Sequence, residues 1–402
     1  MNYILYDWQG FNTNILATHI REMGHNVVIF SYPCKDYNSD TELALKLMEQ
    51  IHSNQIDGVI CFNYFPIVAI TCNACNIQYY SWIYDSPHLT LYSKSVFFPT
   101  NHIGSFDKDL VDELRSYGVN TIFHVPLACD IQDMKERIES PVVNRINPNC
   151  DVSFVGSLYT DLSKRNYYDK FYSNADKQDN IIAGIWNNIE NAVQSQCFNY
   201  KENLIKNNPN VDYAYLNQLM IKEGAMLGTD YFASVKDIVV SSVLERKVTI
   251  SERHKLFKFI AKHCYDKYDF KLFTTSDTSN LGLLNSVNCG PVDYQSEMPS
   301  VFAKSKINIH ITLKSIHTGI PLRVLDILSC GGFLLCDPQT EILENFTDGQ
   351  DIAIYHSPEE CADKIDYYLS HEDARIKIAK NGQKKANELF NYKKMLTILL
   401  NK

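Results

Sequence analysis

The sequence predicts an α/β protein with two doubly wound domains whose strand ends face each other across a cleft. Short apolar runs alternate with helical patterns at both ends of the chain, which is typical of parallel sheets covered by helices. A polar segment with two prolines separates these regions, as expected for a linker. The length of 402 residues also exceeds what one hydrophobic core usually organises, so two domains are expected.

The first domain is predicted to span residues 1–130. Its strands are expected where β-branched and aromatic residues gather between turn signals, at 3–6, 26–30, 58–62, 77–83 and 121–124. Its helices are expected at 12–23, 40–53, 66–73 and 108–117. Gly24 follows the first helix, a common position for glycine because it readily ends a helix.

A linker is predicted over 131–149, which is polar, contains Pro141 and Pro148 and has no apolar strand. The second domain is predicted over 150–388, with strands at 151–156, 270–273, 286–292, 307–311, 333–336 and 352–355. Its weakly amphipathic middle, about 177–263, predicts a helical insertion. Further helices are expected at 359–370, 374–389 and 392–400. We expect the last of them, within 389–402, to return to the first domain.

Composition excludes several functional classes. The formal net charge is −9 and no block of lysine or arginine occurs, so the broad positive surface that nucleic acid binding needs is missing. No stretch approaches the ~20 apolar residues of a membrane span, and the N-terminus does not resemble a signal peptide. The 12 cysteines are scattered, mostly within apolar runs, as reduced buried thiols are. A cytoplasmic protein without a transmembrane segment is therefore expected.

Two cysteines, Cys72 and Cys75, form the single C-x-x-C pattern in the chain. A structural zinc site usually needs a second pair of ligands at similar spacing, and the sequence offers none. We interpret the two cysteines as neighbours on one helix and expect no metal.

The most informative stretch is 318–326, which lies between the apolar runs 307–313 and 332–337. This order predicts a strand, a glycine turn, a helix and a second strand. Thr318 is expected to cap the helix, Gly319 to let a ligand approach the backbone, and Pro321 to occupy the first helical turn. The free amides at such a helix start form a site for anions.

Arg323 and Asp326 lie three residues apart and are expected to project from neighbouring positions on that helix. A single ligand could then present a phosphate to the guanidinium and a diol to the carboxylate, and a nucleoside diphosphate carries both groups. The alternative, an ordinary solvated pair on a capped helix, stays open at this point.

Two further positions are candidates for contact with the same ligand. Gly156 and Ser157 end the first strand of the second domain, and their backbone amides could approach a phosphate because glycine has no Cβ. A tight turn without a ligand is the alternative. Tyr294 is a candidate to border the base, although it could equally be a packing residue.

On the acceptor side, Asp85 and His88 follow the strand predicted at 77–83. Pro87 directs the chain out of that strand, so both side chains are expected on a loop at the strand's carboxyl end. Either could take a proton from an acceptor hydroxyl, with Asp85 the first choice and His88 the second. Alternatively, Asp85 caps a turn and His88 packs in the core.

Several short motifs occur together in the last third of the chain, at 293–294, 297–299, 306–313, 319–326, 331–335, 341, 346, 349, 355–357 and 367–371. With these motifs, the segment from about 290 to 389 resembles GT-B fold glycosyltransferases, in particular the spore maturation protein B-like branch of the group 1 glycosyltransferases. Residues 151–159 look like the start of the family's donor domain, and 57–88 look like its amino-terminal domain. The resemblance implies two Rossmann-like domains, with the nucleotide-sugar donor held mainly by the second.

The wider family carries a Glu-x7-Glu motif whose second carboxylate binds the ribose hydroxyls. Asp326 falls on that second position, whereas Thr318 falls on the first and offers only a hydroxyl. A mechanism that uses the first glutamate on the sugar therefore does not transfer directly. The resemblance further implies that Arg323 and Lys314 neutralise the diphosphate without an essential metal.

The resemblance implies a cytoplasmic glycosyltransferase that moves a hexose or N-acetylhexosamine from a UDP-sugar to a hydroxyl of a protein or glycan. The nucleotide sugar is a substrate, and no cofactor is expected. One alternative is a non-catalytic nucleotide-sugar-binding or assembly protein, which the Thr318 substitution favours. Another is a nucleotide-sugar epimerase, which shares the architecture but needs more acid–base groups in the cleft.

Overall fold

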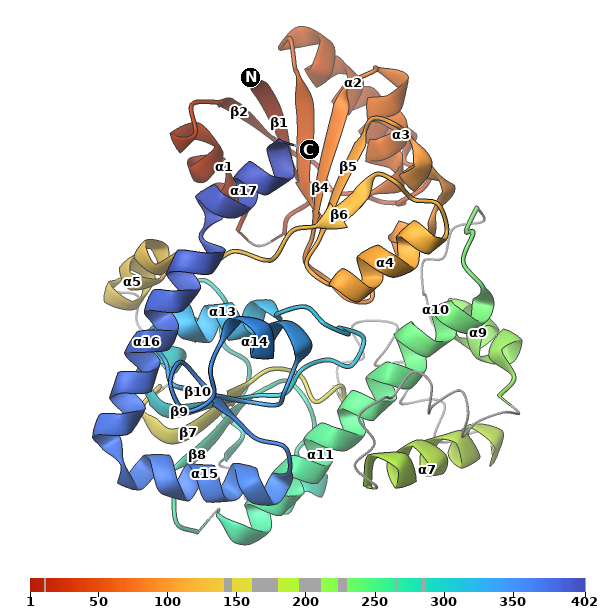
Figure 1. Cartoon of the computed structure of the whole chain (residues 1–402). Helices are drawn as coiled ribbons and strands as arrows, with labels where there is room; N and C mark the ends of the chain where they lie inside the picture. Colours follow the sequence, from red (N-terminus) through yellow and green to blue (C-terminus); the bar gives the residue numbers. More distant parts are fainter. Residues whose placement is uncertain are drawn as a thin grey trace.

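Each of the two alternating regions of the sequence folds around its own parallel sheet (Figure 1). The computed structural model describes residues 1–10, 12–140, 147–160, 180–194, 211–222, 230–264, 266–283 and 287–401. The first sheet has six strands in the order β2-β1-β3-β4-β5-β6, and every neighbouring pair is parallel. Its strands are β1 (Asn2–Asp7), β2 (Asn26–Ser31), β3 (Gly58–Phe62), β4 (Gln78–Ile83), β5 (Asn101–Ser105) and β6 (Ile122–His124).

Helices cover both faces of the first sheet, and residues alternate between the two cores along each strand. In β1, Tyr3 and Leu5 belong to one core, whereas Ile4 and Tyr6 belong to the other. The elements between these strands are α1 (Thr13–Glu22), α2 (Thr41–Ser53), α3 (Pro66–Ala74), the 3-10 turns η1 (Leu89–Tyr92) and η2 (Lys94–Phe97), and α4 (Lys108–Ser116). Helix α5 (Ile131–Glu139) follows β6.

The second sheet has five strands in the order β11-β10-β9-β7-β8, again all parallel. Its strands are β7 (Cys150–Val155), β8 (Phe270–Phe273), β9 (Ser305–His310), β10 (Leu334–Cys336) and β11 (Ala353–Ile354). The elements that accompany them are η4 (Ser279–Leu281), α12 (Met298–Lys304), α13 (Leu322–Ser329), α14 (Thr340–Asn345), α15 (Pro358–Ser370) and α16 (Glu372–Phe390). The predicted α/β fold class with two doubly wound domains is confirmed.

The structure differs from the predicted strands in two places. β5 is a central strand that the sequence did not signal, because its residues include Asn101 and Gly104 rather than an apolar run. The strand expected at 286–292 forms only one parallel bridge, between Leu272 and Asn288, and residue 286 lies outside the described residues.

The final helix, α17 (Tyr392–Leu400), packs against the first sheet although the chain has already passed through the second domain (Figure 1). Met395, Leu396 and Leu399 are buried in the same core as Tyr3. Phe390 O accepts a hydrogen bond of 2.8 Å from the N–H of Cys129, which fixes the crossing point between the domains.

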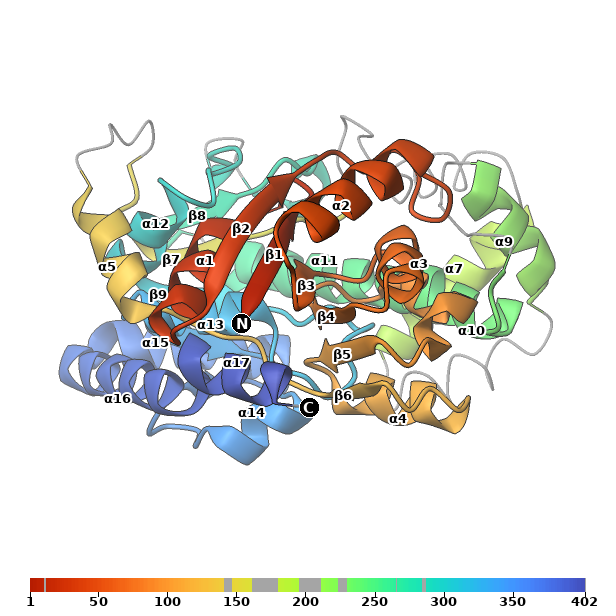
Figure 2. The same cartoon turned by 90° about the horizontal axis from the view of Figure 1, so that it is seen from above.

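Helices between β7 and β8 form a separate lobe beside the second sheet (Figures 1 and 2). The described elements there are α7 (Asn180–Gln194), α9 (Tyr213–Lys222), α10 (Val235–Val239), the π-helical turn η3 (Val240–Leu244) and α11 (Glu245–His263). Other residues of the predicted insertion lie outside the described residues. The lobe also reaches the first domain, because Phe232 N donates to Tyr92 O at 3.1 Å and Tyr117 donates to Asp237 at 2.8 Å.

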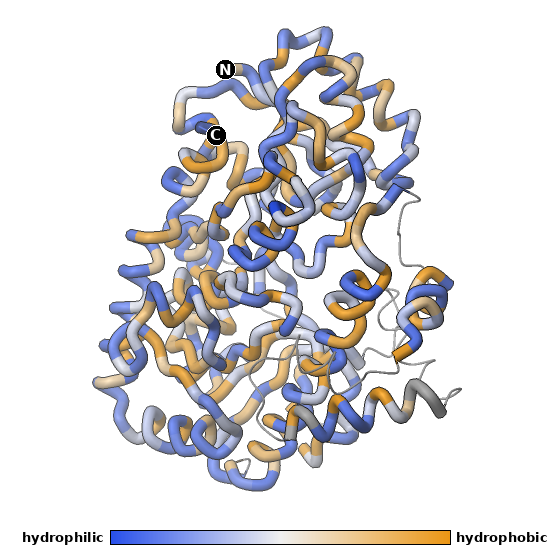
Figure 3. The backbone as a smooth tube through the Cα atoms, turned by 45° about the vertical axis from the view of Figure 1, so that its right-hand side comes forward, coloured by the Kyte–Doolittle hydropathy of each residue, from blue (hydrophilic) through white to orange (hydrophobic). Residues whose placement is uncertain are grey.

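Hydrophobic and hydrophilic residues alternate along the surface helices (Figure 3), as expected for helices with one buried face. In the part of the chain that the structure describes, no helix is both long enough and apolar enough to cross a membrane.

Candidate functional site

The second sheet reverses its strand order between β7 and β9, because the chain adds β8 on one side of β7 and β9 on the other. Open α/β sheets bind ligands beyond the carboxyl ends of their strands at such a reversal. The loop after β7 carries Gly156 and Ser157, and the loop after β9 carries Lys314, Thr318 and Gly319. The candidate site therefore lies at this edge of the second sheet.

The loop after β7 is held by its own hydrogen bonds. Gly156 N donates to Phe273 O at 3.2 Å, and the Ser157 hydroxyl accepts from Tyr159 N at 2.8 Å. The amide of Gly156 is thus engaged within the protein, and both residues line the edge of the site as a turn.

Arg253, on α11, bridges the reversal point. Its guanidinium donates to the carbonyls of Ser157 and Ile311, the latter at 2.7 Å, and so joins the loops after β7 and β9. The side chain is buried and lies 5.1 Å from the ring of Tyr159. Sequence reasoning missed Arg253, because its position in the middle of a long helix gives no signal that this helix passes beside the site.

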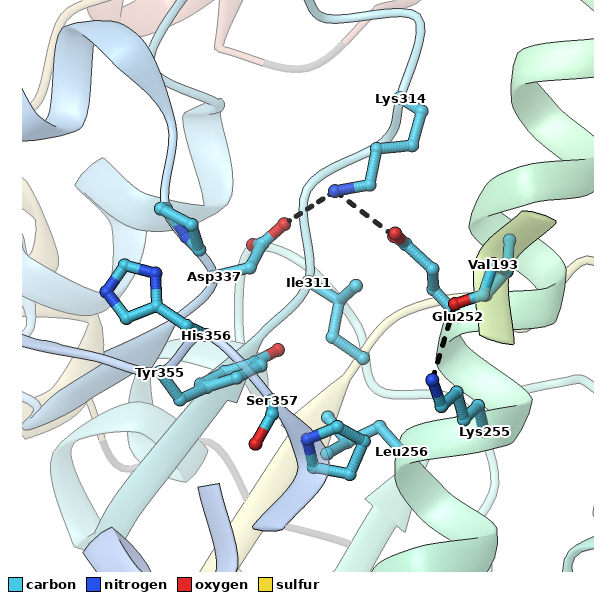
Figure 4. A pocket seen from close by; sticks show the side chains of 12 residues that line it. Val193, Glu252, Lys255, Leu256, Ile311, Lys314, Asp337, Tyr355, His356 and Ser357 are labelled. Carbon is cyan, nitrogen blue, oxygen red and sulfur yellow. Dashed lines mark hydrogen bonds and ion pairs between the residues drawn. The ribbon is translucent and has the colours of Figure 1, made fainter. Parts of the chain in front are cut away.

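Lys314 lies between two carboxylates (Figure 4). Its Nζ is 3.1 Å from Glu252 of α11 and 3.0 Å from Asp337, which follows β10. Burial alone would raise the pKa of Asp337, but Lys314 and the N–H of Thr312 outweigh it and lower the pKa below its usual range. Lys314 and Asp337 therefore form a fixed, charged pair at the carboxyl edge of the sheet.

A cavity of about 110 Å³ opens beside this pair, between α11 and the segment that follows β11 (Figure 4). We call it the Lys314 cavity. Its lining comprises Val193, Glu252, Lys255, Leu256, Ile311, Lys314, Asp337, Pro338, Tyr355, His356, Ser357 and Pro358. Polar groups therefore surround an apolar floor at the strand ends.

The loop before α13 differs from its prediction. The helix begins at Leu322 with Pro321 as its N-cap, so the prediction that Thr318 caps it is wrong. Thr318 instead donates its hydroxyl to Asp107 of the first domain at 2.7 Å. The same carboxylate accepts from the N–H groups of His317 at 2.6 Å and Thr318 at 3.2 Å. The backbone amides of this loop do hold an anion, but that anion is the protein's own aspartate.

Gly319 lies directly beneath the first domain. A Cβ at this position would come within 2.5 Å of the carbonyl oxygen of Phe106. The absence of a side chain thus lets two backbones approach each other, and in this structure the approaching group is Phe106 rather than a ligand.

His317 adds a second tie between the domains. One ring nitrogen is 2.7 Å from Asp109 of α4, and the other is 2.9 Å from Glu245 at the start of α11. Burial would lower the pKa of His317, but Glu245, Asp109 and Asp107 outweigh it and raise the pKa to about 11. The imidazolium therefore joins the loop, the first domain and the helical lobe.

Asp326 and Arg323 lie together on α13, as predicted, with 3.4 Å between guanidinium and carboxylate. The guanidinium also contacts Met298 and the ring of Phe302, so it faces α12. Tyr294 donates to Asp326 at 3.1 Å and accepts from Asn12 of the first domain.

The Asp326 carboxyl is 4% exposed, and burial raises its pKa to about 6 against the opposing effects of Arg323 and Tyr294. The structure therefore joins three of the predicted residues, Tyr294, Arg323 and Asp326, in one network at the domain boundary.

Asp85 and His88 differ in their availability. Asp85 is exposed, and Asn63 donates to its carboxylate at 2.7 Å. His88 Nε2 accepts from Tyr64 N at 3.0 Å, and burial lowers the pKa of His88 despite the nearby Asp85. The adjacent Ser86 donates to Ser315 O at 2.5 Å, which places this loop against the loop after β9. Of the two predicted bases, Asp85 is exposed to solvent, whereas the Nε2 atom of His88 is engaged by the Tyr64 amide.

Comparisons with known proteins bear on the fold and on the sequence of the last part of the chain. Residues 253–401 match a family model described as glycosyl transferase-like, and no curated protein matches the sequence. A glycosyltransferase from Rickettsia africae has a TM-score of 0.55 and 11% identity, covering 100% of this chain and 97% of that one.

Two further solved structures are similar over the same extent. HepE of Anabaena in complex with UDP-glucose has a TM-score of 0.53 and 12% identity, covering 100% of this chain and 98% of that one. Sucrose-phosphate synthase of Thermosynechococcus elongatus has a TM-score of 0.52 and 8% identity, with the same coverage. The GT-B fold expected from the resemblance is confirmed, and the end of the chain is glycosyltransferase-like in sequence. The spore maturation protein B-like branch stays a prediction.

Proposed function

We propose that this chain, glycosyltransferase-like in fold and in the sequence of its second domain, transfers a sugar from a nucleoside diphosphate sugar to a hydroxyl of a protein or glycan. The donor is proposed to be a UDP-hexose or UDP-N-acetylhexosamine. One observation carries the proposal. The matched segment, 253–401, supplies Arg253 and Lys314, which lie beside the strand ends of the second sheet, and Asp326 on α13. The likeness to HepE, whose structure holds UDP-glucose, supports the donor class.

We assign the donor mainly to the second domain. Asp326 accepts the ribose hydroxyls, and Tyr294, its present partner, borders the base. The amides of His317 and Thr318, with Gly319 beside them, meet the diphosphate charge in the place where Asp107 now accepts hydrogen bonds. Lys314 is assigned to the same charge from its position beside Asp337. Gly156 and Ser157 border this position, and Arg323 keeps its ion pair with Asp326.

We assign the acceptor to the first domain, with Asp85 as the general base. Its exposed carboxylate can accept the proton of an attacking hydroxyl, while Asn63 holds its orientation. Negative charge that develops on the departing diphosphate is met by Lys314 and the loop amides. The scheme assigns no metal ion, so chelators are expected to leave the activity unchanged.

Two measurements test the proposal. Calorimetric titration with UDP, GDP and ADP should show UDP binding that Asp326→Asn weakens. Nucleotide release from UDP-glucose or UDP-N-acetylglucosamine, with and without EDTA, should fall at least tenfold in Asp85→Asn while UDP affinity is kept. Asp112→Asn, a change at an exposed position of α4, serves as the control. Failure of every nucleoside diphosphate to bind would overturn the proposal.

One observation favours a second function. Thr318 replaces the carboxylate of the family motif, and its hydroxyl is committed to Asp107. A protein that binds nucleotide sugars without transferring them would show UDP affinity but no nucleotide release with any acceptor.

A further inference from the structure

The helical lobe makes a second connection between the two domains. The chain crosses between the domains near α5 and α16, whereas α9 and α10 of the lobe lie on the opposite side of the molecule (Figures 1 and 2). In the lobe, α10, η3 and α11 follow one another without a break, and we call them the rod. Arg253, which joins the loops after β7 and β9, lies on the rod, so the rod extends from the lobe to the candidate site.

The rod and α4 of the first domain are tied at two points. At the end of α4, the Tyr117 hydroxyl donates to Asp237 at 2.8 Å. Near its start, the ring of His317 lies 2.7 Å from Asp109 and 2.9 Å from Glu245. Asp237 precedes Glu245 by eight residues on the rod, and Asp109 precedes Tyr117 by eight. Equal lengths of the two segments therefore face each other in opposite directions.

An aromatic anchor lies beside the outer of these two ties. The ring of Phe232, which precedes the rod, is 5.1 Å from that of Phe97 and 5.4 Å from that of Tyr117. Its N–H donates to Tyr92 O at 3.1 Å, and the two rings are 6.1 Å apart. Both the side chain and the backbone of the lobe are thus docked on the first domain.

The anchor is less buried than the connection on the other side of the molecule. In α17, Met395, Leu396 and Leu399 are at most 2% exposed. At the anchor, Phe97 is 42% exposed and Tyr117 is 38% exposed. Elements with few buried apolar contacts open at a lower free energy than core elements do. The domains are therefore expected to separate first at the anchor.

Separation at the anchor would also affect the loop before α13. Asp107 is the N-cap of α4, and its carboxylate accepts from the N–H groups of His317 at 2.6 Å and Thr318 at 3.2 Å. Because α4 is a single helix, movement of its end at Tyr117 also moves Asp107 at its start. The two loop amides then lose the acceptor that covers them.

We propose that the lobe is a releasable brace, in which the Phe232 ring is the contact that detaches. While it is attached, the brace holds the two domains at one angle and keeps the amides of His317 and Thr318 covered by Asp107. Its release lets the domains separate and exposes these amides. Release requires no nucleotide, so it can be measured on the full chain alone.

Small-angle scattering and hydrogen exchange of the full chain test the brace. Phe232→Asp removes the ring and places a charge among the aromatic side chains. It should increase the radius of gyration and accelerate exchange at least tenfold in both 235–239 and 315–321. The matched control, Tyr367→Asp, replaces a ring on α15 that stacks on His371 at 4.0 Å, and should change neither segment. An unchanged radius of gyration, or faster exchange confined to the lobe, would overturn the proposal.

A milder variant decides the question if thermal melting shows that the charged variant does not fold. Tyr117→Phe keeps the ring and removes only the hydroxyl that donates to Asp237. Loss of this one hydrogen bond should accelerate exchange about threefold in 235–239 and in 315–321. Tyr367→Phe, at an exposed position, is its control. Acceleration in both segments supports the brace, whereas acceleration in 235–239 alone, or in neither segment, would show that the two ties are independent and refute it.

Discussion

The loop at 315–321 and the Lys314 cavity lie at the same edge of the second sheet, yet one is filled by the protein and the other is open. The loop amides are occupied by Asp107, and Gly319 lies against Phe106. The cavity is built within the second domain and its helical lobe, with no lining residue from the first domain. The comparison shows that the sequence of the glycine turn determines the local backbone geometry. Which group lies against that backbone depends instead on contacts made by the other domain.

The largest expected effect is a loss of stability when the imidazolium of His317, which joins the loop to Asp109 and Glu245, is removed. His317→Ala would leave Glu245, whose side chain is 1% exposed, without its cationic partner. Breaking a buried ion pair costs roughly 3–5 kcal/mol of stability. Because Asp109 is half-exposed, we expect the loss of the His317 ion pairs to cost an amount near the lower end of that range. Urea denaturation should show a loss of about 3 kcal/mol, whereas His356→Ala, at the exposed cavity rim, should change little. Equal losses in the two variants would mean that the loop is not held in this way.

The same residue predicts a pH dependence with a definite sign. Because folding raises the pKa of His317 to about 11, its stabilisation is complete below the unfolded pKa of about 6.5. That stabilisation declines as the pH rises from about 6.5 and is lost as it passes about 11. The stability difference between wild type and His317→Ala should therefore be largest below pH 6.5. A difference that grows with pH would contradict the assigned ion pairs.

The next effect concerns the close approach of the two backbones. In Gly319→Ala the new methyl group would lie 2.5 Å from Phe106 O, so the domains must shift apart. Overpacking of this kind typically costs about 1–3 kcal/mol. Gly184→Ala, in a helix of the lobe with no heavy atom within 4 Å of the added carbon, should be neutral or stabilising. An unchanged melting temperature in Gly319→Ala would show that the loop is not covered by the first domain.

The sequence predicts most of the fold because apolar strands and helical periodicity are local signals. Strand β5 was not predicted, because contacts with other elements, rather than an apolar sequence, hold Asn101 and Gly104 in it. Asn101 donates to Ser95 O at 2.8 Å, and a Cβ at Gly104 would come within 3.0 Å of both Val125 and Leu399. Its strand conformation is determined by its neighbours rather than by its own residues.

The residues of the candidate site likewise fall into those that local sequence signals predict and those that depend on contacts distant in the sequence. Residues that directly follow strands, such as Asp85 and Lys314, could be predicted because parallel strands end at one edge. The roles of Arg253 and Asp107 could not be predicted, because their hydrogen-bond partners are distant in the sequence. Arg253 is 58 residues from Ile311, and Asp107 is 210 residues from His317. The sequence placed Thr318 near the helix, but its hydroxyl donates to Asp107 of the other domain.

A further prediction concerns the ribose end of the site. Burial raises the pKa of Asp326 to about 6, and only the ionised carboxylate accepts hydrogen bonds from both hydroxyls of a diol. UDP affinity should therefore be constant above pH 7 and fall roughly tenfold per pH unit below 6, about 1.4 kcal/mol each. Calorimetry at several pH values checks this, and Asp326→Asn should bind weakly without this dependence. Equal pH profiles for the two proteins would remove Asp326 from the binding role.

The smallest effect tests the occupant of the loop directly. If the Asp107 carboxylate competes with a donor phosphate for the amides of His317 and Thr318, its neutralisation should favour the donor. Asp107→Asn retains one oxygen for the start of α4 but lacks the negative charge, so UDP should bind about threefold tighter. The exposed Asp112→Asn removes the same charge from the same helix and should leave the affinity unchanged. Weaker binding in Asp107→Asn would show instead that this aspartate shapes the loop for the donor, and that the filled loop and the open cavity act as one site.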